Sequence, residues 1–232
     1  LRVFSYIASE GRFPYVKELN LSGNHIADEG FADLSHAIMN GALATVENLI
    51  LSANALDDDA FQSLSVACYT NGRLLPCIKV LDLSDNFLTD EGVEMWCQSI
   101  AMSGALSTLR ALKLGTNLFG PGILGSIARC AQEGGFKGLR ELGLSNNAVG
   151  DDGIRDAFPQ VVLNAKRKTK MTGKDSMEAA KAAVARGKAF LGSIENLQLN
   201  NNRIGSAGLS SLAEACKRVG TTALKQLWLG GN

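Results

Sequence analysis

The sequence predicts an α/β solenoid, an arc or horseshoe with parallel β-strands on its concave face, α-helices on its convex face and about seven repeats. Two periodic patterns carry this prediction. Apolar residues recur at helical spacing after each copy of a short motif. That motif has the form LxxLxLxxN and ends at Asn24, Asn54, Asn86, Asn117, Asn147, Asn202 and Asn232. The intervals between these asparagines are 30, 32, 31, 30, 55 and 30 residues, and a period near 30 is typical of a solenoid.

Each motif predicts a short strand followed by a turn. All of its apolar positions hold Leu, Ile or Val, and the last two alternate with variable residues. This period of two indicates a strand with one buried face. Because a turn packed between coils leaves backbone groups that need partners, we expect the Asn amide to bond the backbone of neighbouring coils.

The second half of each repeat predicts a helix. Residues 2, 7, 10 and 14 positions after the Asn are apolar in all six repeats that continue. Steps of three and four place them on one helix face. Acidic pairs such as Asp28-Glu29 and Asp90-Glu91 precede this face. They fit the positive end of a helix dipole.

The turn-to-helix segments carry a family resemblance. Residues 24–30, 86–92 and 147–153 share an Asn, an acidic pair and a Gly at matching positions. With the strand motif, they make the chain similar to the ribonuclease-inhibitor-like class of leucine-rich repeats, over nearly its whole length except residues 162–188 or so. That class includes enzyme inhibitors, a GTPase-activating protein for a nuclear-transport GTPase and innate-immune sensor domains. The resemblance thus implies a protein partner.

Charge and cysteine usage limit the function classes. The formal net charge is +0, so nucleic acid is not an expected partner. No run of 18 apolar residues and no signal peptide occur, so a membrane is not expected either. The 5 cysteines form no CxxC pair, and an odd number cannot all pair within the chain. Free buried thiols predict an intracellular, cytoplasmic protein.

Both ends of the chain fall inside a repeat. Residues 1–10 have the pattern of a helix end, and the last motif finishes at Asn232. Solenoids need polar caps at their ends, and neither end has one. We therefore expect residues 1–232 to form a single repeat domain that belongs to a longer chain or a complex.

An insertion interrupts the period at about residues 162–188. Residues 176–186 are Ala-rich and predict a helix, whereas residues 166–174 predict a basic loop. Two interpretations stay open, a solvated loop or a docking site for an acidic protein or nucleic acid. No aromatics are interleaved, which argues against stacking on single strands. The candidate basic residues are Lys166, Arg167, Lys168, Lys170 and Lys174.

No motif predicts catalysis, a cofactor or a metal. Residues 120–125 match GxGxxG, and Glu141 stands where a ribose-binding acid would be sought. However, Leu124 and Ile127 fill the helix positions that are apolar in every repeat, so the match is structural. The two histidines, His25 and His36, have no Cys cluster nearby and supply no triad.

The variable strand positions supply the candidate binding residues, because they should point out of the concave face. Trp228 and Ile50 are notable as large apolar groups in these positions, and aromatic anchors are common at binding hot spots. Packing against further repeats is the alternative for Trp228. The candidates are Glu18, Ile50, Asp82, Lys113, Glu141, Gln198, Gln226 and Trp228.

These patterns favour a non-catalytic protein-interaction scaffold that binds a partner on its concave face, with the basic insertion as a second contact. The alternative is a GTPase-activating or other GTPase-regulating protein of this repeat type, which the resemblance suggests. A third hypothesis is a fragment of an immune-type sensor, which would need a nucleotide-binding domain outside residues 1–232.

Overall fold

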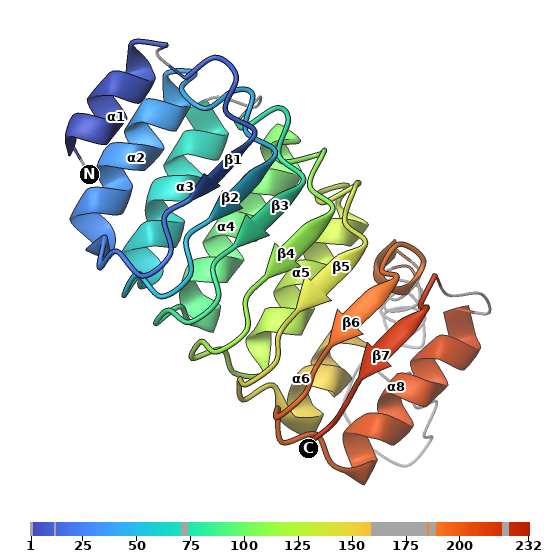
Figure 1. The fold of residues 1–232 in the computed structure, drawn as a ribbon. Helices are drawn as coiled ribbons and strands as arrows, with labels where there is room; N and C mark the ends of the chain where they lie inside the picture. The colour runs from blue at the N-terminus through green and yellow to red at the C-terminus, as the bar shows by residue number, and fades with distance from the viewer. Residues whose placement is uncertain (1, 12, 71–73, 159–184, 186–188, 220–222) are drawn as a thin grey trace, which may run out of the picture.

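The strands of the chain stack into one open parallel sheet. The structure is a computed structural model and describes residues 2–11, 13–70, 74–158, 185, 189–219 and 223–232. Its 7-stranded sheet follows chain order, with every neighbouring pair parallel (Figure 1). The strands are β1 (Glu18–Asn20), β2 (Asn48–Ile50), β3 (Val80–Asp82), β4 (Ala111–Lys113), β5 (Glu141–Gly143), β6 (Asn196–Gln198) and β7 (Gln226–Trp228).

The described helices all lie on one face of this sheet, each beside the next (Figure 1). A helix with its side chains is about 10–12 Å wide, whereas neighbouring strands are about 4.8 Å apart. The helix-free face is therefore the concave side of the solenoid, as predicted. The helices are α1 (Arg2–Ser9), α2 (Ala27–Met39), α3 (Asp58–Thr70), α4 (Asp90–Ser103), α5 (Gly122–Gln132), α6 (Gly150–Ala157) and α8 (Ser206–Val219).

The core lies between the sheet and the helices. The central strand residues and the helix residues of the 3/4 pattern meet there, and Leu112, Leu124 and Ile127 are 0% exposed. Leu124 and Ile127 confirm that the GxGxxG match belongs to the core of α5. The ring of Trp96 stacks on that of Phe61, with centroids 4.9 Å apart. Repeats bury their apolar faces only against neighbours, so the core is linear.

The asparagines form a ladder through the solenoid, as the sequence predicts. The Asn117 amide donates to the carbonyls of Leu83 at 3.0 Å and Leu114 at 3.1 Å, and its oxygen accepts from the N–H of Leu88 at 3.1 Å. Each side chain therefore ties its own turn to the preceding coil. Five of these residues are buried, namely Asn54, Asn86, Asn117, Asn147 and Asn202.

Aspartates at the helix starts form a second set of links between coils. The Asp90 carboxylate accepts the N–H groups of Gly120 at 3.1 Å and Gly122 at 2.7 Å in the next repeat. Burial raises the pKa of Asp90, and these N–H donors oppose the rise. A Cβ on Gly122 would lie 2.8 Å from Asp90 Oδ2. The acidic residues thus do more than face a helix dipole, and the neighbouring glycines make room for them.

The predicted basic insertion finds no test in the fold. The basic residues 166–174 and nearly all of the predicted insertion lie outside the described residues. Among the described helices, none is long and apolar enough to cross a membrane.

Candidate partner-binding surface

The concave face presents two rows of side chains, fixed by the register of the strands. The central residue of each strand points into the core, and its two neighbours point out. The first row is Glu18, Asn48, Val80, Ala111, Glu141, Asn196 and Gln226. The second row is Asn20, Ile50, Asp82, Lys113, Gly143, Gln198 and Trp228. All eight predicted concave-face residues therefore lie in these two rows.

Four of the predicted residues meet in pairs near the middle of the sheet. Lys113 Nζ lies 3.7 Å from Asp82 Oδ2, which is an ion pair between β4 and β3. Gln198 Nε2 donates to Glu141 Oε1 at 3.2 Å, which links β6 to β5. The structure does not bring the other four into this centre. Glu18 on β1 and Gln226 on β7 are six strand spacings apart, about 29 Å.

The two apolar candidates differ in exposure. Trp228 is 51% exposed, whereas Ile50 is only partly exposed, so Ile50 faces solvent less than its position predicts. Leu227, which points to the opposite face of β7, is itself 41% exposed. Exposure alone therefore does not distinguish Trp228. Its place in the second concave row keeps it as the aromatic candidate.

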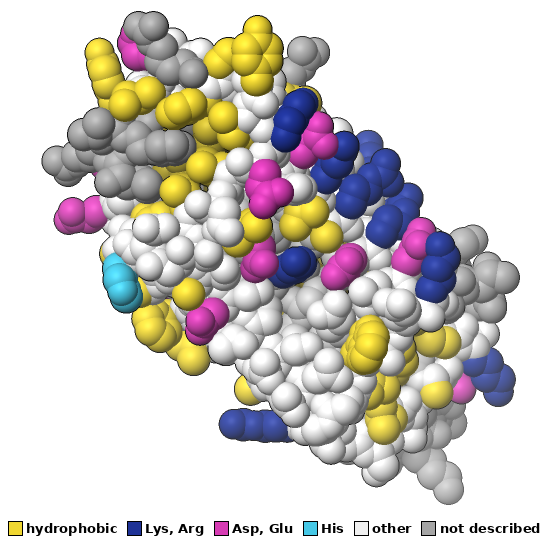
Figure 2. Space-filling model, in the orientation of Figure 1, with side chains coloured by type: hydrophobic (Ala, Val, Ile, Leu, Met, Phe, Trp, Pro, Cys, Tyr) yellow, Lys and Arg dark blue, Asp and Glu magenta, His cyan; other side chains and the backbone are white. Residues whose placement is uncertain are grey.

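Charged residues form a third row, which the sequence analysis missed, at the edge of the sheet where the strands begin. The N–H of each bonds the carbonyl of the one before, at 2.7–2.8 Å, so their backbones are stacked in a continuous ladder. Figure 2 shows Lys and Arg side chains gathered along this edge. This charged row is Lys17, Glu47, Lys79, Arg110, Arg140, Glu195 and Lys225.

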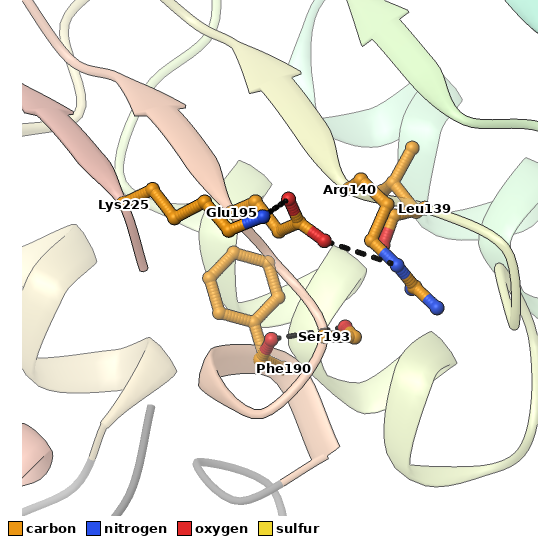
Figure 3. Close-up of polar contacts among 6 residues, drawn as sticks. All are labelled: Leu139, Arg140, Phe190, Ser193, Glu195 and Lys225. Atoms are coloured by element: carbon orange, nitrogen blue, oxygen red, sulfur yellow. Dashed lines mark hydrogen bonds and ion pairs between the residues drawn. The ribbon is translucent and has the colours of Figure 1, made fainter. Parts of the chain in front are cut away.

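Two glutamates near the ends of the charged row each pair with two cations. Glu47 contacts Lys17 at 3.2 Å and Lys79 at 2.5 Å. Glu195 contacts Lys225 at 2.5 Å and Arg140 at 3.7 Å (Figure 3).

These contacts favour the charged form of both glutamates. The hydrogen bond from Lys79 is the main reason that the pKa of Glu47 lies below its ordinary value, and Lys225 lowers the pKa of Glu195 in the same way. Both carboxylates therefore stay ionised to a lower pH than an unpaired glutamate would.

The signal for the charged row was present in the sequence. The residue after the first apolar position of LxxLxL is charged in all seven motifs. Strand alternation did not predict this row, because the alternating positions begin one residue after it. The backbone ladder shows that stacking between coils extends beyond the strands themselves.

Among residues covered by the structure, no group of three His, Cys, Asp or Glu could hold a metal ion. All five cysteines are free thiols. Burial raises the pKa of Cys68 to about 12, and a hydrogen bond with Cys130 raises that of Cys97 well above its ordinary value. Neither thiol is a nucleophile at neutral pH.

Comparisons with known proteins bear on this fold. A family model described as "Leucine Rich repeat" matches residues 14–35, 75–95, 139–156 and 193–213. A ribonuclease inhibitor from Sus scrofa is 34% identical over 139 residues, which cover 60% of this chain and 28% of the relative. The chain carries leucine-rich repeats and is similar to the ribonuclease-inhibitor-like class. It therefore spans little more than a quarter of that relative's length.

Solved structures resemble this leucine-rich-repeat chain at low sequence identity. One is titled Leiomodin-1 actin-binding site 2, with a TM-score of 0.50, 16% identity and coverage of 79% of this chain and 87% of that one. Another is the tropomodulin C-terminal domain from Caenorhabditis elegans, with a TM-score of 0.49, 15% identity and coverage of 80% and 92%. At such identity, the first of these supports the fold alone.

Proposed function

We propose that this leucine-rich-repeat chain is a non-catalytic scaffold that binds a partner protein on its concave face. The observation that carries the proposal is the pair of outward rows, which none of the described helices covers. They combine polar side chains with an exposed aromatic group, Trp228, and a partly exposed aliphatic group, Ile50. Aromatic anchors surrounded by polar groups are typical of protein-binding surfaces.

The charges of the concave rows favour a partner with a mixed surface. The two rows together hold three carboxylates, Glu18, Asp82 and Glu141, and one cation, Lys113. Asp82 is already paired with Lys113, and Glu141 accepts a hydrogen bond from Gln198. Such a face lacks the dense acidic lining that suits a strongly basic protein. A ribonuclease, suggested by the name of the Sus scrofa relative, is a first partner to test directly.

GTPase regulation is the weaker alternative on the same surface. Such a regulator would use acidic and Asn side chains near the strand ends to position groups of its partner. Here Asn20 accepts hydrogen bonds from the backbone and hydroxyl of Ser22, and Asn200 accepts from the N–H of Gly230. These amides have partners within the sheet, which favours the scaffold. GTP hydrolysis by candidate small GTPases, with and without the chain, measures the alternative.

We also infer an intracellular location. All five cysteines are free, and Cys68, Cys97 and Cys130 are buried in the helix layer. Thiols persist in reducing compartments. Fractionation of cells that express the tagged chain would place it, and recovery only from the medium would contradict the inference.

Capture from a native lysate tests the scaffold proposal. The intact chain is compared with Trp228→Ala and with Tyr69→Ala, a control that removes another half-exposed aromatic ring, from the helix side. We expect Trp228→Ala to reduce capture at least about tenfold, the effect of a hot-spot residue. Tyr69→Ala should leave capture unchanged. If both variants capture the same partners as the intact chain, the concave face is not the binding surface.

A further inference from the structure

Three consecutive members in the middle of the charged row are cations. The N–H of Arg110 donates to the carbonyl of Lys79, and that of Arg140 donates to the carbonyl of Arg110, both at 2.8 Å. This stacking places successive backbones one strand spacing apart, about 4.8 Å. The basic triplet Lys79, Arg110 and Arg140 is thus built on a rigid ladder at the starts of β3, β4 and β5.

Arg110 stands at the centre of the basic triplet without a carboxylate of its own. Glu47 and Glu195, the acids of the row, lie beyond the two outer cations and contact those. Within the part of the chain that the structure describes, no ion pair reaches Arg110, whose side chain is exposed. Like charges on neighbouring strands are destabilising. The chain therefore carries a local positive charge that its own described residues leave without a counter-charge.

Figure 2 shows what surrounds this patch. Lys and Arg side chains dominate the middle of the edge, and Asp and Glu side chains appear towards both of its ends and on the neighbouring sheet. By residue, the acids on the sheet beside the basic triplet are Asp82 on β3 and Glu141 on β5. The patch is consequently short and is bounded by carboxylates on three sides.

We propose that the basic triplet docks an acidic segment of a partner protein. An Arg guanidinium can donate two parallel hydrogen bonds to one carboxylate, so Arg110 supplies the central contact, with Lys79 and Arg140 on either side. The spacing of the row suits a helical segment. Side chains three or four residues apart on a helix are about 5–6 Å apart, close to one strand spacing, whereas same-face residues of a strand are about 6.7 Å apart.

The surroundings favour an acidic protein segment over nucleic acid. The sugar–phosphate backbone of a nucleic acid is charged at every nucleotide, so along the row it would have to pass Glu47 or Glu195 after leaving the basic triplet. A short acidic segment can end before reaching them. The proposal extends the scaffold function by giving a partner a definite chemistry. Its test changes none of the concave-face candidates, so the two proposals can fail separately.

Binding of a labelled synthetic peptide tests the inference. The peptide is a short helix former with glutamates at every third or fourth residue, and fluorescence anisotropy follows its binding to the chain at low salt. We expect Arg110→Gln to weaken binding about threefold, and the combined Lys79→Gln, Arg110→Gln and Arg140→Gln variant to weaken it at least about tenfold. Added salt should weaken binding by the intact chain, because exposed charges are screened.

Matched controls make the outcome decisive. Arg203→Gln removes the same charge from the opposite end of the strands, next to the Asn202 turn, and should leave binding unchanged. A peptide with glutamine in place of glutamate should not bind.

The proposal is overturned if the acidic peptide does not bind the intact chain, or if Arg203→Gln weakens binding as much as Arg110→Gln. Tighter, Arg110-dependent binding of single-stranded oligothymidylate would assign the patch to nucleic acid instead. Arg110→Gln breaks no ion pair among the described residues, so its unfolding midpoint should match that of the intact chain.

Discussion

Two rows of polar side chains cross the same sheet, one at each end of the strands, and they differ in burial and in the partners of their side chains. The asparagine ladder follows the strands, and its five inner members are buried. The charged row precedes the strands, and its cations are exposed or half-exposed. In every motif the charged residue precedes the strand and the Asn follows it, as Arg110 and Asn117 do around β4.

This difference shows how a repeat separates stability from recognition. The amide of each inner Asn has backbone partners that are the same in every coil, so only one residue type suits the position. A side chain in the charged row has neighbouring side chains and solvent as partners, so its sign can change from coil to coil. A position that holds the same residue type in every repeat therefore indicates a structural role. A position that is always charged but varies in sign is compatible with binding.

Removal of an inner Asn should have the largest effect on stability. Asn117→Ala leaves the buried N–H of Leu88 without its partner and removes one of the two amide donors to the carbonyls of Leu83 and Leu114, which keep Asn86 and Asn147. We therefore expect it to lower the free energy of unfolding by about 1–3 kcal/mol. Asn24→Ala is the matched control, because Asn24 is exposed and its amide donates within its own turn, to the Ser22 carbonyl at 3.1 Å. Urea unfolding measures both. Equal midpoints for Asn117→Ala and the intact chain would refute the role of the ladder.

Filling the space beside a helix-start aspartate should have the next largest effect. A Cβ on Gly92 would lie 2.5 Å from Asp58 Oδ1, and overpacking of this kind costs about 1–3 kcal/mol. Alanine is favoured over glycine in a helix by about 0.5–1 kcal/mol, so the net loss in Gly92→Ala should be near 1 kcal/mol. At Gly143, a Cβ meets its nearest neighbour at 3.5 Å. Gly143→Ala should therefore be tolerated, and a larger loss there than at Gly92 would contradict this account.

The charged row should contribute only a small, pH-dependent stability. The pKa of Glu47 is lower in the folded chain than its ordinary value of 4.5, chiefly through Lys79. Its contribution is then fully present above 4.5 and is lost as the pH falls through the lower, folded-state pKa. Glu47→Gln should slightly lower the urea midpoint at neutral pH and leave it unchanged in strong acid. Glu133→Gln, on the helix side, serves as the control, and a loss that grows towards low pH would reverse the predicted sign.

Most of the fold was predictable because its signals are local and repeat. The positions of Leu, Ile and Val give the strands and helix faces, and the Asn position gives the turn, since each depends on backbone geometry that recurs in every coil. Links between coils are harder to predict. Asp90 bonds Gly120 and Gly122, about 30 residues away, and nothing in the local sequence says that an acidic residue at a helix start will reach the next repeat.

The candidate site was predictable in place but less so in composition. Alternation along the strands placed Glu141, Gln198 and Trp228 on the concave face correctly. It could not show that Glu141 would bond Gln198, or that Ile50 would be partly covered, because both depend on packing between neighbouring strands. The charged row was missed because its residues lie just outside the strands, although the same stacking continues through them.

Side-by-side comparison of Asn117→Ala and Arg110→Gln tests the separation of stability and recognition most directly. The two residues flank the same strand, so differences in local environment along the solenoid are small. We expect Asn117→Ala to lower the urea midpoint clearly. Arg110→Gln should leave the midpoint within error and weaken binding of the acidic peptide. If Arg110→Gln destabilises the chain as much as Asn117→Ala does, the charged row is a structural ladder and the distinction between the two rows fails.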